Sequence, residues 1–294
     1  MSANTKSKRV AIGVPYLFFV VLLLIPFLLV LSISFSVSEL AVPPYTPILA
    51  WADKTLSISL NFANYTAVLS DGIYIQAFGS SIKFALINTL LCLLIGYPMA
   101  YCIARSSYAA RSYLLILVML PMWLSFLVRV YAWMAMLKSD GFINQFLMWL
   151  GVIQEPLSLY RTNFSVYLVM VITYLPLMIV PIYNCLIKID ESYVEAAYDL
   201  GARPLTVLRC VTLPLSKSGI VAGSLLVFIP SIGEYVIPEL MGGADTLMLG
   251  RVIWQEFFSN LDWPMTSAIT CIMVLILLVP LALFNKRSVQ GGIQ

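Results

Sequence analysis

The segment VEAAYDLGARPLTVLRCVTLPL, residues 194–215, places Glu, Asp and Arg side chains between two long apolar stretches. Of the 294 residues in the chain, 61% are hydrophobic and 11% are charged, and the mean hydropathy is +0.94. A soluble domain typically has about 25% charged residues, so this chain lacks the charge to cover a water-facing surface. The composition therefore predicts a membrane protein in which residues 194–215 form a polar connection outside the lipid.

The apolar stretches predict six transmembrane helices. A helix that spans a bilayer needs about 20 mostly apolar residues, and the charge-free stretches of that length are 10–38, 84–104, 162–187 and 263–285. Two further spans carry a charge inside them: Arg129 lies in 112–137, and Glu234 lies in 218–238. Since a helix satisfies its own backbone polar groups in lipid, we predict an all-α integral membrane protein. The first stretch exceeds the 7–15 residues of a signal-peptide core, and we expect it to be retained.

The distribution of Lys and Arg predicts the orientation, because loops on the cytoplasmic side carry an excess of both. With the N-terminus in the cytoplasm, the eleven inner residues are Lys6, Lys8, Arg9, Arg105, Arg111, Lys188, Arg203, Arg209, Lys217, Lys286 and Arg287. The four outer residues are Lys54, Lys138, Arg161 and Arg251. Both termini are therefore predicted to be cytoplasmic.

Acidic residues show the opposite distribution. The nine predicted on the outer side are Glu39, Asp53, Asp71, Asp140, Glu155, Glu239, Asp245, Glu256 and Asp262. This excess fits either an ordinary solvated face or a surface that attracts a cation or a basic partner. The outer loop 39–79 is expected to form a small cap with strand-like pieces. The outer loop 138–161 is expected to contain a short amphipathic segment that lies at the membrane interface.

Several chemical functions are excluded by what the sequence lacks. The chain has no histidine, which rules out imidazole metal ligands and Ser–His nucleophile pairs. No glycine is followed by lysine, so the chain has no P-loop to hold ATP phosphates. We expect no cofactor, no metal and no ATP site of its own, so any ATP hydrolysis would belong to a partner.

Residues 190–204 read as a short surface helix. Ser192 is a candidate N-cap with Glu195 three residues later, which is the capping-box pattern. Gly201 suits the turn that ends the helix, and Pro204 suits the start of the next one. Such a helix could dock into a groove of a soluble partner.

This segment resembles the EAA loop in the permease subunits of ABC importers. The matching positions are Glu195, Ala196, Ala197, Gly201, Val211, Leu213 and Pro214, with Val211 where the pattern often has Ile. The resemblance implies that these residues form the coupling helix that sits in a cleft of the ATP-binding subunit. The segments YPMAYCIARS (97–106), VFIPSIGEYVIPELMGG (227–243) and GRVIWQEFFSNLDWP (250–264) resemble the putrescine/spermidine permease subunits, the putrescine type most closely.

The resemblance implies a type I importer in the bacterial inner membrane that takes up polyamines. Its expected partners are a second permease subunit, a cytoplasmic ATP-binding subunit dimer and a periplasmic polyamine-binding protein, without nucleic acid. We expect a cytoplasmic tail (1–10), a six-span permease domain (11–285) with its coupling loop at 188–217, and a cytoplasmic tail (286–294).

Glu234 is the main candidate for the substrate pathway. A carboxylate within a span usually faces the bundle interior or a water-filled cavity, and Pro230, Gly233 and Pro238 suggest a broken helix that lines one. The alternative is a structural ion pair with Arg129. Aromatic faces also bind ammonium groups, and the aromatic candidates are Trp123, Tyr131, Trp133 and Tyr235, although Trp and Tyr also gather at membrane interfaces.

Other functions stay open on the sequence alone. The alternatives are a permease for another small solute, including an anion, and a secondary transporter. The outer acidic excess and Glu234 disfavour an anion. A secondary transporter often shows repeated halves, and we find no convincing repeat. A choice between putrescine and spermidine does not follow from the residues.

Overall fold

The computed structural model describes residues 3–52, 55–243 and 246–291, with side chains for 13, 15–48, 59–243 and 246–282. Predictions that use Asp53, Lys54 and Asp245 fall outside the described residues. Those that use Lys6, Lys8, Arg9, Lys286 and Arg287 fall outside the described side chains. The chain divides into two units, residues 1–75 with 253–279 and residues 76–252 with 280–294, which are described separately.

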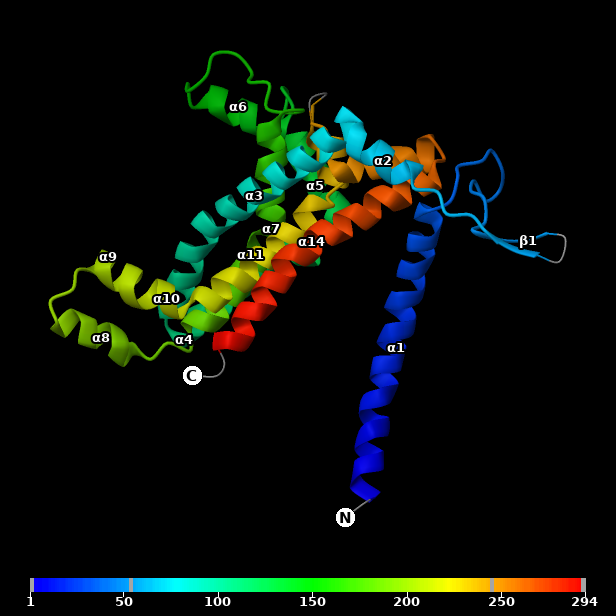
Figure 1. Ribbon diagram of the computed structural model, residues 1–294. Coiled ribbons are helices and arrows are strands. Elements are labelled where there is room, and N and C mark those ends of the chain that lie inside the picture. The colour runs from blue at the N-terminus through cyan, green and yellow to red at the C-terminus, as the bar shows by residue number, and fades with distance from the viewer. Residues whose placement is uncertain (1–2, 53–54, 244–245, 292–294) are drawn as a thin grey trace. The chain divides into compact units, whose positions relative to one another are not determined.

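The larger unit is a helical bundle (Figure 1). Its first helices are α3 (Gly72–Arg105, in this unit from residue 76), α4 (Tyr108–Trp123), α5 (Phe126–Leu137), α6 (Phe142–Trp149) and α7 (Asn163–Leu186). They are followed by α8 (Glu191–Asp199), α9 (Pro204–Val207), the π-helix η1 (Leu208–Thr212), α10 (Leu213–Leu215), α11 (Lys217–Ile232), α12 (Val236–Met241) and α13 (Leu249–Trp254).

Helix α7 is the centre of this bundle. Thirteen of its residues are buried, including Met170, Met178 and Ile182. Helix α11 packs along it through two glycines: a Cβ on Gly219 would lie 2.7 Å from the Pro181 carbonyl oxygen, and one on Gly223 would lie 2.9 Å from the Met178 sulfur. Small residues let helices approach closely in a membrane, where dispersion contacts take over from the hydrophobic effect.

Two pairs of helices in the larger unit are bent at a short break, and one of these breaks lies inside a predicted span. The span predicted at 112–137 breaks between α4 and α5, and the pair Tyr108–Trp123 and Phe126–Trp149 is bent by 91°. The backbone is extended at Leu124 and Ser125, directly after a turn that contains Pro121. Pro121 has no N–H to donate to the carbonyl of Leu117, which weakens the last turns of α4 before this break.

The second bend separates Pro204–Leu215 from Lys217–Ile232, at 69°. Pro214 has no N–H to donate to the carbonyl four residues earlier. The preceding turn is a π-helix, in which the N–H of Leu213 donates to the carbonyl of Leu208. Four described helices are long and apolar enough to span a membrane, and up to six if each bent pair counts as one span. The predicted number of six spans is therefore the upper limit of the four to six that the described residues contain.

The smaller unit contains α1 (Ala3–Ser34), the strands β1 (Leu49–Ala52) and β2 (Thr55–Ile58), α2 (Ala63–Ser70), the π-helix η2 (Gln255–Ser259) and the first part of α14 (Trp263–Gly291). The strands form an antiparallel hairpin, in agreement with the strand-like pieces expected in this loop. Helix α1 exposes apolar side chains from Tyr16 to Leu29, as expected of a helix that faces lipid or another helix.

One helix begins well before the position that the sequence predicted. Helix α3 starts at Gly72, twelve residues before the predicted start at Phe84. Lys83 ends the charge-free stretch, but its side chain is exposed on the helix surface, where a long cationic side chain can reach water. One charge therefore did not end the helix.

We predict that Gly223→Ala lowers the thermal unfolding temperature of the detergent-solubilised protein. The added methyl would fall 2.9 Å from the Met178 sulfur and 3.0 Å from its carbonyl oxygen, and overpacking of this kind costs about 1–3 kcal/mol. Gly79→Ala is the control, because a Cβ there meets nothing within 4 Å. Equal unfolding temperatures for the two variants would contradict the packing described here.

Candidate functional site

The EAA segment forms a short helix with a well-defined start. Asp190 is the N-cap of α8, and its carboxylate accepts the backbone N–H of Ser192 at 3.0 Å. This hydrogen bond holds the pKa of Asp190 below its ordinary value. The predicted N-cap at Ser192 is therefore wrong, because Ser192 lies inside the first turn. Asp190 takes the position, since a carboxylate also interacts favourably with the positive end of the helix dipole.

The end of α8 has the geometry that the sequence predicted for Gly201. Gly201 has a φ of +80°, its N–H bonds to the carbonyl of Tyr198, and the N–H of Ala202 bonds to the carbonyl of Ala197. These two bonds form a Schellman motif, in which glycine takes a left-handed conformation without strain. Arg203 and Pro204 then begin α9, with Pro204 in its first turn.

Much of the surface of α8 has no cover within this chain. Glu195 and Ala196 are exposed and Ala197 is half-buried, while Leu200 is 90% exposed. One ion pair joins α8 to α3: Arg105 Nη1 lies 2.7 Å from Glu191 Oε1. The matched residues Val211 and Leu213 are half-buried and Pro214 is exposed. The segment thus presents small and apolar groups outward from a helix attached to the bundle.

Glu234 lies at the break between α11 and α12. It is 8% exposed, and its Oε1 accepts the backbone N–H groups of Val236 at 3.1 Å and Ile237 at 3.3 Å. The other carboxylate oxygen accepts a hydrogen bond from the Tyr174 hydroxyl on α7. The first N–H groups of a helix lack acceptors within the helix, and in α12 the Glu234 carboxylate is the acceptor for two of them.

Arg129 is not an ion-pair partner of Glu234. The ion pairs among the described side chains are Arg105–Glu191 and Arg251–Glu239, so the structural alternative posed by the sequence is wrong. Arg129 instead acts electrostatically on the Tyr174 hydroxyl, and its buried Nε has no hydrogen-bond partner. The Tyr174 hydroxyl, rather than Arg129, is therefore the side-chain partner of the Glu234 carboxylate. Sequence reasoning missed Tyr174, and its only signal was a hydroxyl in a charge-free span.

The aromatic candidates do not form one cluster. Trp123 is 73% exposed at the end of α4 and Tyr131 is 49% exposed on α5, while Trp133 is half-buried against the core. Tyr235 follows Glu234 and is half-buried. On this chain, Tyr235 is the aromatic candidate next to the carboxylate.

Close packing fixes the position of Glu234. A Cβ added to Gly250 on α13 would lie 2.6 Å from the Glu234 carbonyl oxygen and 2.8 Å from that of Gly233. Nearby in the bundle, Asn88 donates to the Ser231 hydroxyl at 2.9 Å. Glycine at 250 lets α13 lie directly on the backbone of the break, while the carboxylate is held by Tyr174 and the first N–H groups of α12.

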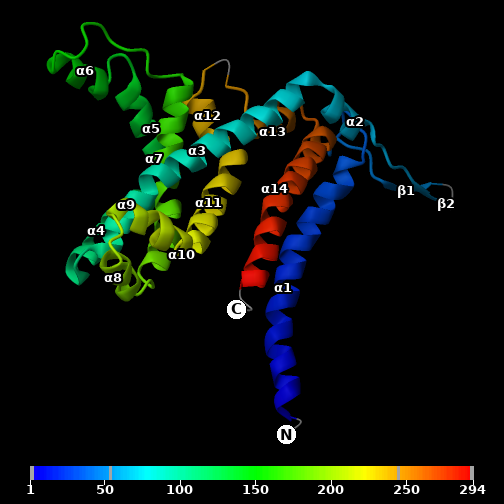
Figure 2. The same ribbon diagram turned by 60° about the vertical axis from the view of Figure 1, so that its left-hand side comes forward.

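The two candidate sites lie at opposite ends of the larger unit. Helices α8, α9 and α10 are at one end, together with the end of α3, while α6 and α12 are at the other (Figures 1 and 2). Such a separation is required if α8 couples to a partner on one side of the membrane and Glu234 lies near the other side.

The comparisons identify the family of the chain. Residues 92–285 match the family described as binding-protein-dependent transport system inner membrane component. This protein belongs to that family of ABC importer permeases, in which ATP is hydrolysed by separate subunits.

Two curated relatives are permeases named for polyamines. The spermidine/putrescine transport system permease protein PotB of Escherichia coli (strain K12) is 40% identical over 74% of this chain and 80% of its own length. The protein of the same name from Haemophilus influenzae is 33% identical over 94% of this chain and 93% of its own length. The chain is homologous to these permease subunits.

A solved structure supports the fold. A chain of a bacterial alginate ABC transporter, crystallised in complex with an alginate pentasaccharide-bound periplasmic protein, aligns with a TM-score of 0.65 and 16% identity. The alignment covers 97% of this chain and 95% of that chain. The predicted type I permease architecture is confirmed at the level of the fold.

We predict that Glu234→Ala lowers stability more than Glu234→Gln. Alanine leaves two buried N–H groups of α12 and the Tyr174 hydroxyl without their acceptor, and each such loss costs about 1–3 kcal/mol. Glutamine keeps one oxygen that can accept the N–H groups. The measurement is the thermal unfolding temperature of the purified protein.

The matched control is Glu239→Ala on α12, which removes a partly exposed ion pair with Arg251. A surface pair of this kind contributes about 0–1 kcal/mol. If Glu234→Ala and Glu239→Ala lower the unfolding temperature equally, Glu234 does not stabilise the helix break.

Proposed function

We propose that this chain forms half of the membrane pathway of an ATP-driven importer for polyamines. The observation that carries the proposal is the 40% identity to a spermidine/putrescine permease over most of the chain. The chemistry is consistent, because polyamines are cations and the outer segments carry more acids than bases. The buried Glu234 adds one carboxylate where an ammonium group would cross.

The proposed topology has both termini in the cytoplasm of a bacterial cell. It comprises a tail (1–10), a permease domain of six spans (11–285) and a tail (286–294), in the inner membrane. The separation of α8 and α12 at opposite ends of the larger unit supports opposite sides of the membrane for the coupling loop and for the residues beside Glu234 (Figure 2). The family description as an inner membrane component agrees with this location.

The coupling loop, residues 188–217, is proposed to dock α8 into a cytoplasmic ATP-binding subunit. Glu195, Ala196 and Leu200 are exposed and so accessible to a partner, and burial of the apolar surface of Ala196 and Leu200 in such a contact would favour association. Gly201, Leu213 and Pro214 shape the loop rather than supply the contact. The remaining proposed partners are a second permease subunit and a periplasmic polyamine-binding protein.

The proposed pathway combines Glu234 with Tyr235, Arg129 and the aromatic side chains. Glu234 already accepts three hydrogen bonds, so an ammonium group would meet a carboxylate that is fixed in place. Trp123 and Tyr131 are exposed on this chain and could contact substrate only where a second subunit faces them. Arg129 would repel a cation, which makes it a candidate barrier rather than a ligand.

The test of the proposed function is uptake of radiolabelled putrescine by cells whose importer contains this chain. Unlabelled putrescine and spermidine should compete, and an inorganic oxyanion such as molybdate should not. Competition by molybdate without competition by either polyamine would assign the importer to anions instead.

We predict that Glu234→Gln lowers the efficiency of polyamine uptake by about tenfold to a hundredfold, or about 1.4 kcal/mol for each factor of ten. The reason is the loss of a negative charge at a point where the surroundings cannot hydrate an ammonium group. Glu239→Gln is the control on the same helix. If uptake by Glu234→Gln falls only in proportion to the amount of folded protein, Glu234 is a structural cap alone.

We predict that Gly201→Val reduces transport while the subunit still inserts into the membrane. The φ of +80° is costly for any residue with a Cβ, by about 1–2 kcal/mol, although no neighbouring atom lies within 4 Å of the added carbon. Gly201→Asn is the matched control, because asparagine tolerates this conformation better. The measurements are uptake and ATP hydrolysis by the assembled complex, and normal uptake by Gly201→Val would exclude a coupling role for this turn.

A further inference from the structure

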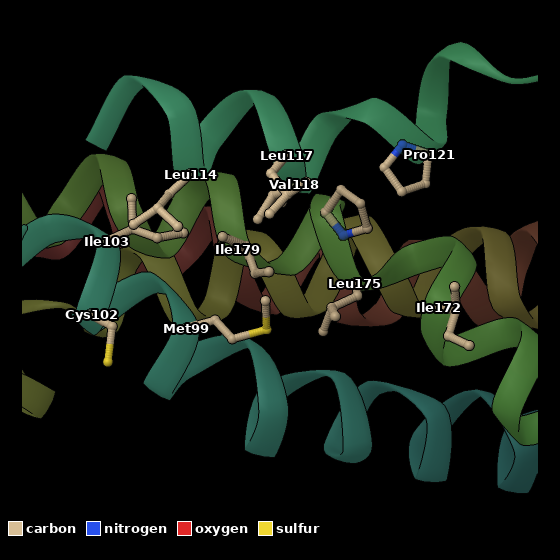
Figure 3. A pocket seen from close by; sticks show the side chains of 11 residues that line it. Met99, Cys102, Ile103, Leu114, Leu117, Val118, Pro121, Ile172, Leu175 and Ile179 are labelled. Carbon is tan, nitrogen blue, oxygen red and sulfur yellow. The ribbon is translucent and has the colours of Figure 1, made fainter. Parts of the chain in front are cut away.

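A cavity of about 340 Å³ lies between α3, α4 and α7 in the larger unit. Figure 3 shows Leu114 and Val118 of α4 facing Ile103 of α3 and Ile179 of α7. All the side chains that line it are apolar apart from the thiol of Cys102. Its volume is at the lower end of the range for ligand pockets, and nothing in its lining could orient a polar solute such as a polyamine.

Two arginines, Arg105 and Arg111, flank the turn that joins α3 to α4, close in the chain to the cavity residues Ile103 and Leu114. Arg111 precedes Leu114 by three residues and Val118 by seven, so it shares their face of α4. Its Nη2 donates to the carbonyl oxygens of Ala104 at 2.8 Å and Ser106 at 3.2 Å. Because Ala104 follows the cavity residue Ile103, these bonds hold the guanidinium at the cavity's end.

Arg111 has hydrogen-bonding capacity that the protein does not use. Among the described residues it has no ion-pair partner, and its guanidinium donates hydrogen bonds to them through Nη2 alone. Guanidinium groups bind phosphate strongly and with defined geometry. Arg105 adds a second positive charge at the same turn, and Glu191 pairs with it rather than with Arg111.

The start of α4 adds a further attraction for anions. Helix α4 has 16 residues and no acidic residue in its first turn, so the positive end of its dipole is not compensated. Ser107 caps it through one long hydrogen bond of 3.5 Å to Ala110. Tyr108 and Tyr113 are 85% and 74% exposed, as is typical of aromatic residues at the level of lipid headgroups.

We propose that this cavity and the α3–α4 turn bind an anionic phospholipid. One acyl chain would occupy the apolar slot between α3, α4 and α7, and the phosphate would bind Arg111 at the first turn of α4. Apolar surface joined to a basic pocket between transmembrane helices is the recognised arrangement for anionic lipids. The Arg105–Glu191 ion pair places this lipid beside α8, so its leaflet is the one on the side of the coupling loop. The proposal does not depend on which solute is transported.

The test measures lipids bound to the purified, delipidated importer complex by native mass spectrometry. Dioleoyl-phosphatidylglycerol and dioleoyl-phosphatidylcholine are added at equal concentrations, and inorganic phosphate is added in a third experiment. We expect the complex to retain phosphatidylglycerol in preference to phosphatidylcholine. Equal retention of the two lipids would overturn the proposal, and so would displacement of phosphatidylglycerol by millimolar phosphate, which would indicate a site for the free anion.

Two matched pairs of variants locate the site. Arg111→Gln should weaken phosphatidylglycerol binding by about tenfold, the loss expected for a hydrogen bond to a charged group, whereas Lys83→Gln should leave it unchanged, because Lys83 is an exposed cation elsewhere on α3. Leu117→Trp should fill the cavity and displace the lipid, whereas Ile116→Trp, on an exposed neighbour outside the lining, should not.

The second pair keeps the proposal testable if Arg111→Gln fails to fold. Unchanged lipid retention in Leu117→Trp would exclude this cavity as the site. If Leu117→Trp breaks the complex apart and Ile116→Trp does not, the cavity holds a helix of another subunit, and the lipid proposal is wrong.

Discussion

A polypeptide in lipid has to satisfy its own backbone hydrogen bonds, and polar side chains meet part of this requirement at two places where a helix of this protein is interrupted. At the break between α11 and α12, the N–H groups of Val236 and Ile237 are bonded to the carboxylate of Glu234. At the bend before α11, Ser216 donates to the carbonyl of Thr212 and its oxygen lies 3.1 Å from the Tyr97 hydroxyl. At both of these breaks a polar side chain therefore hydrogen-bonds to the irregular backbone.

The same requirement gives Glu234 two roles that do not conflict. A charge that only lined a pathway would be free to move and would be costly to bury. A charge that also caps a helix and accepts from Tyr174 has its desolvation partly offset by hydrogen bonds. The proposed pathway thus uses a carboxylate whose position is already fixed, which lowers the cost of arranging it around a passing cation.

Close contact between helices both fixes the bundle and connects the two candidate sites. Gly219 and Gly223 bring α11 onto α7, and Gly250 brings α13 onto the break at Glu234. Helices α11 and α7 also join the two candidate sites, because α11 starts beside the coupling loop and ends at Glu234. A displacement of α8 by an ATP-binding subunit would therefore have a rigid route to the carboxylate, through packed helices rather than through loops.

The sequence by itself determined the membrane class, the positions of most spans, the family and the turn at Gly201. These follow from local properties: runs of apolar residues, fixed spacing, and a backbone conformation that favours glycine. It did not determine the partners of Glu234, the cap at Asp190, the bends after Trp123 and Leu215, or the cavity beside Arg111. Glu234 and Tyr174 are 60 residues apart, and which of several polar groups meets a buried carboxylate depends on how α7, α11 and α12 pack. Only the tertiary structure decides that, because the free energy of such a contact depends on burial and direction, which residue spacing does not specify.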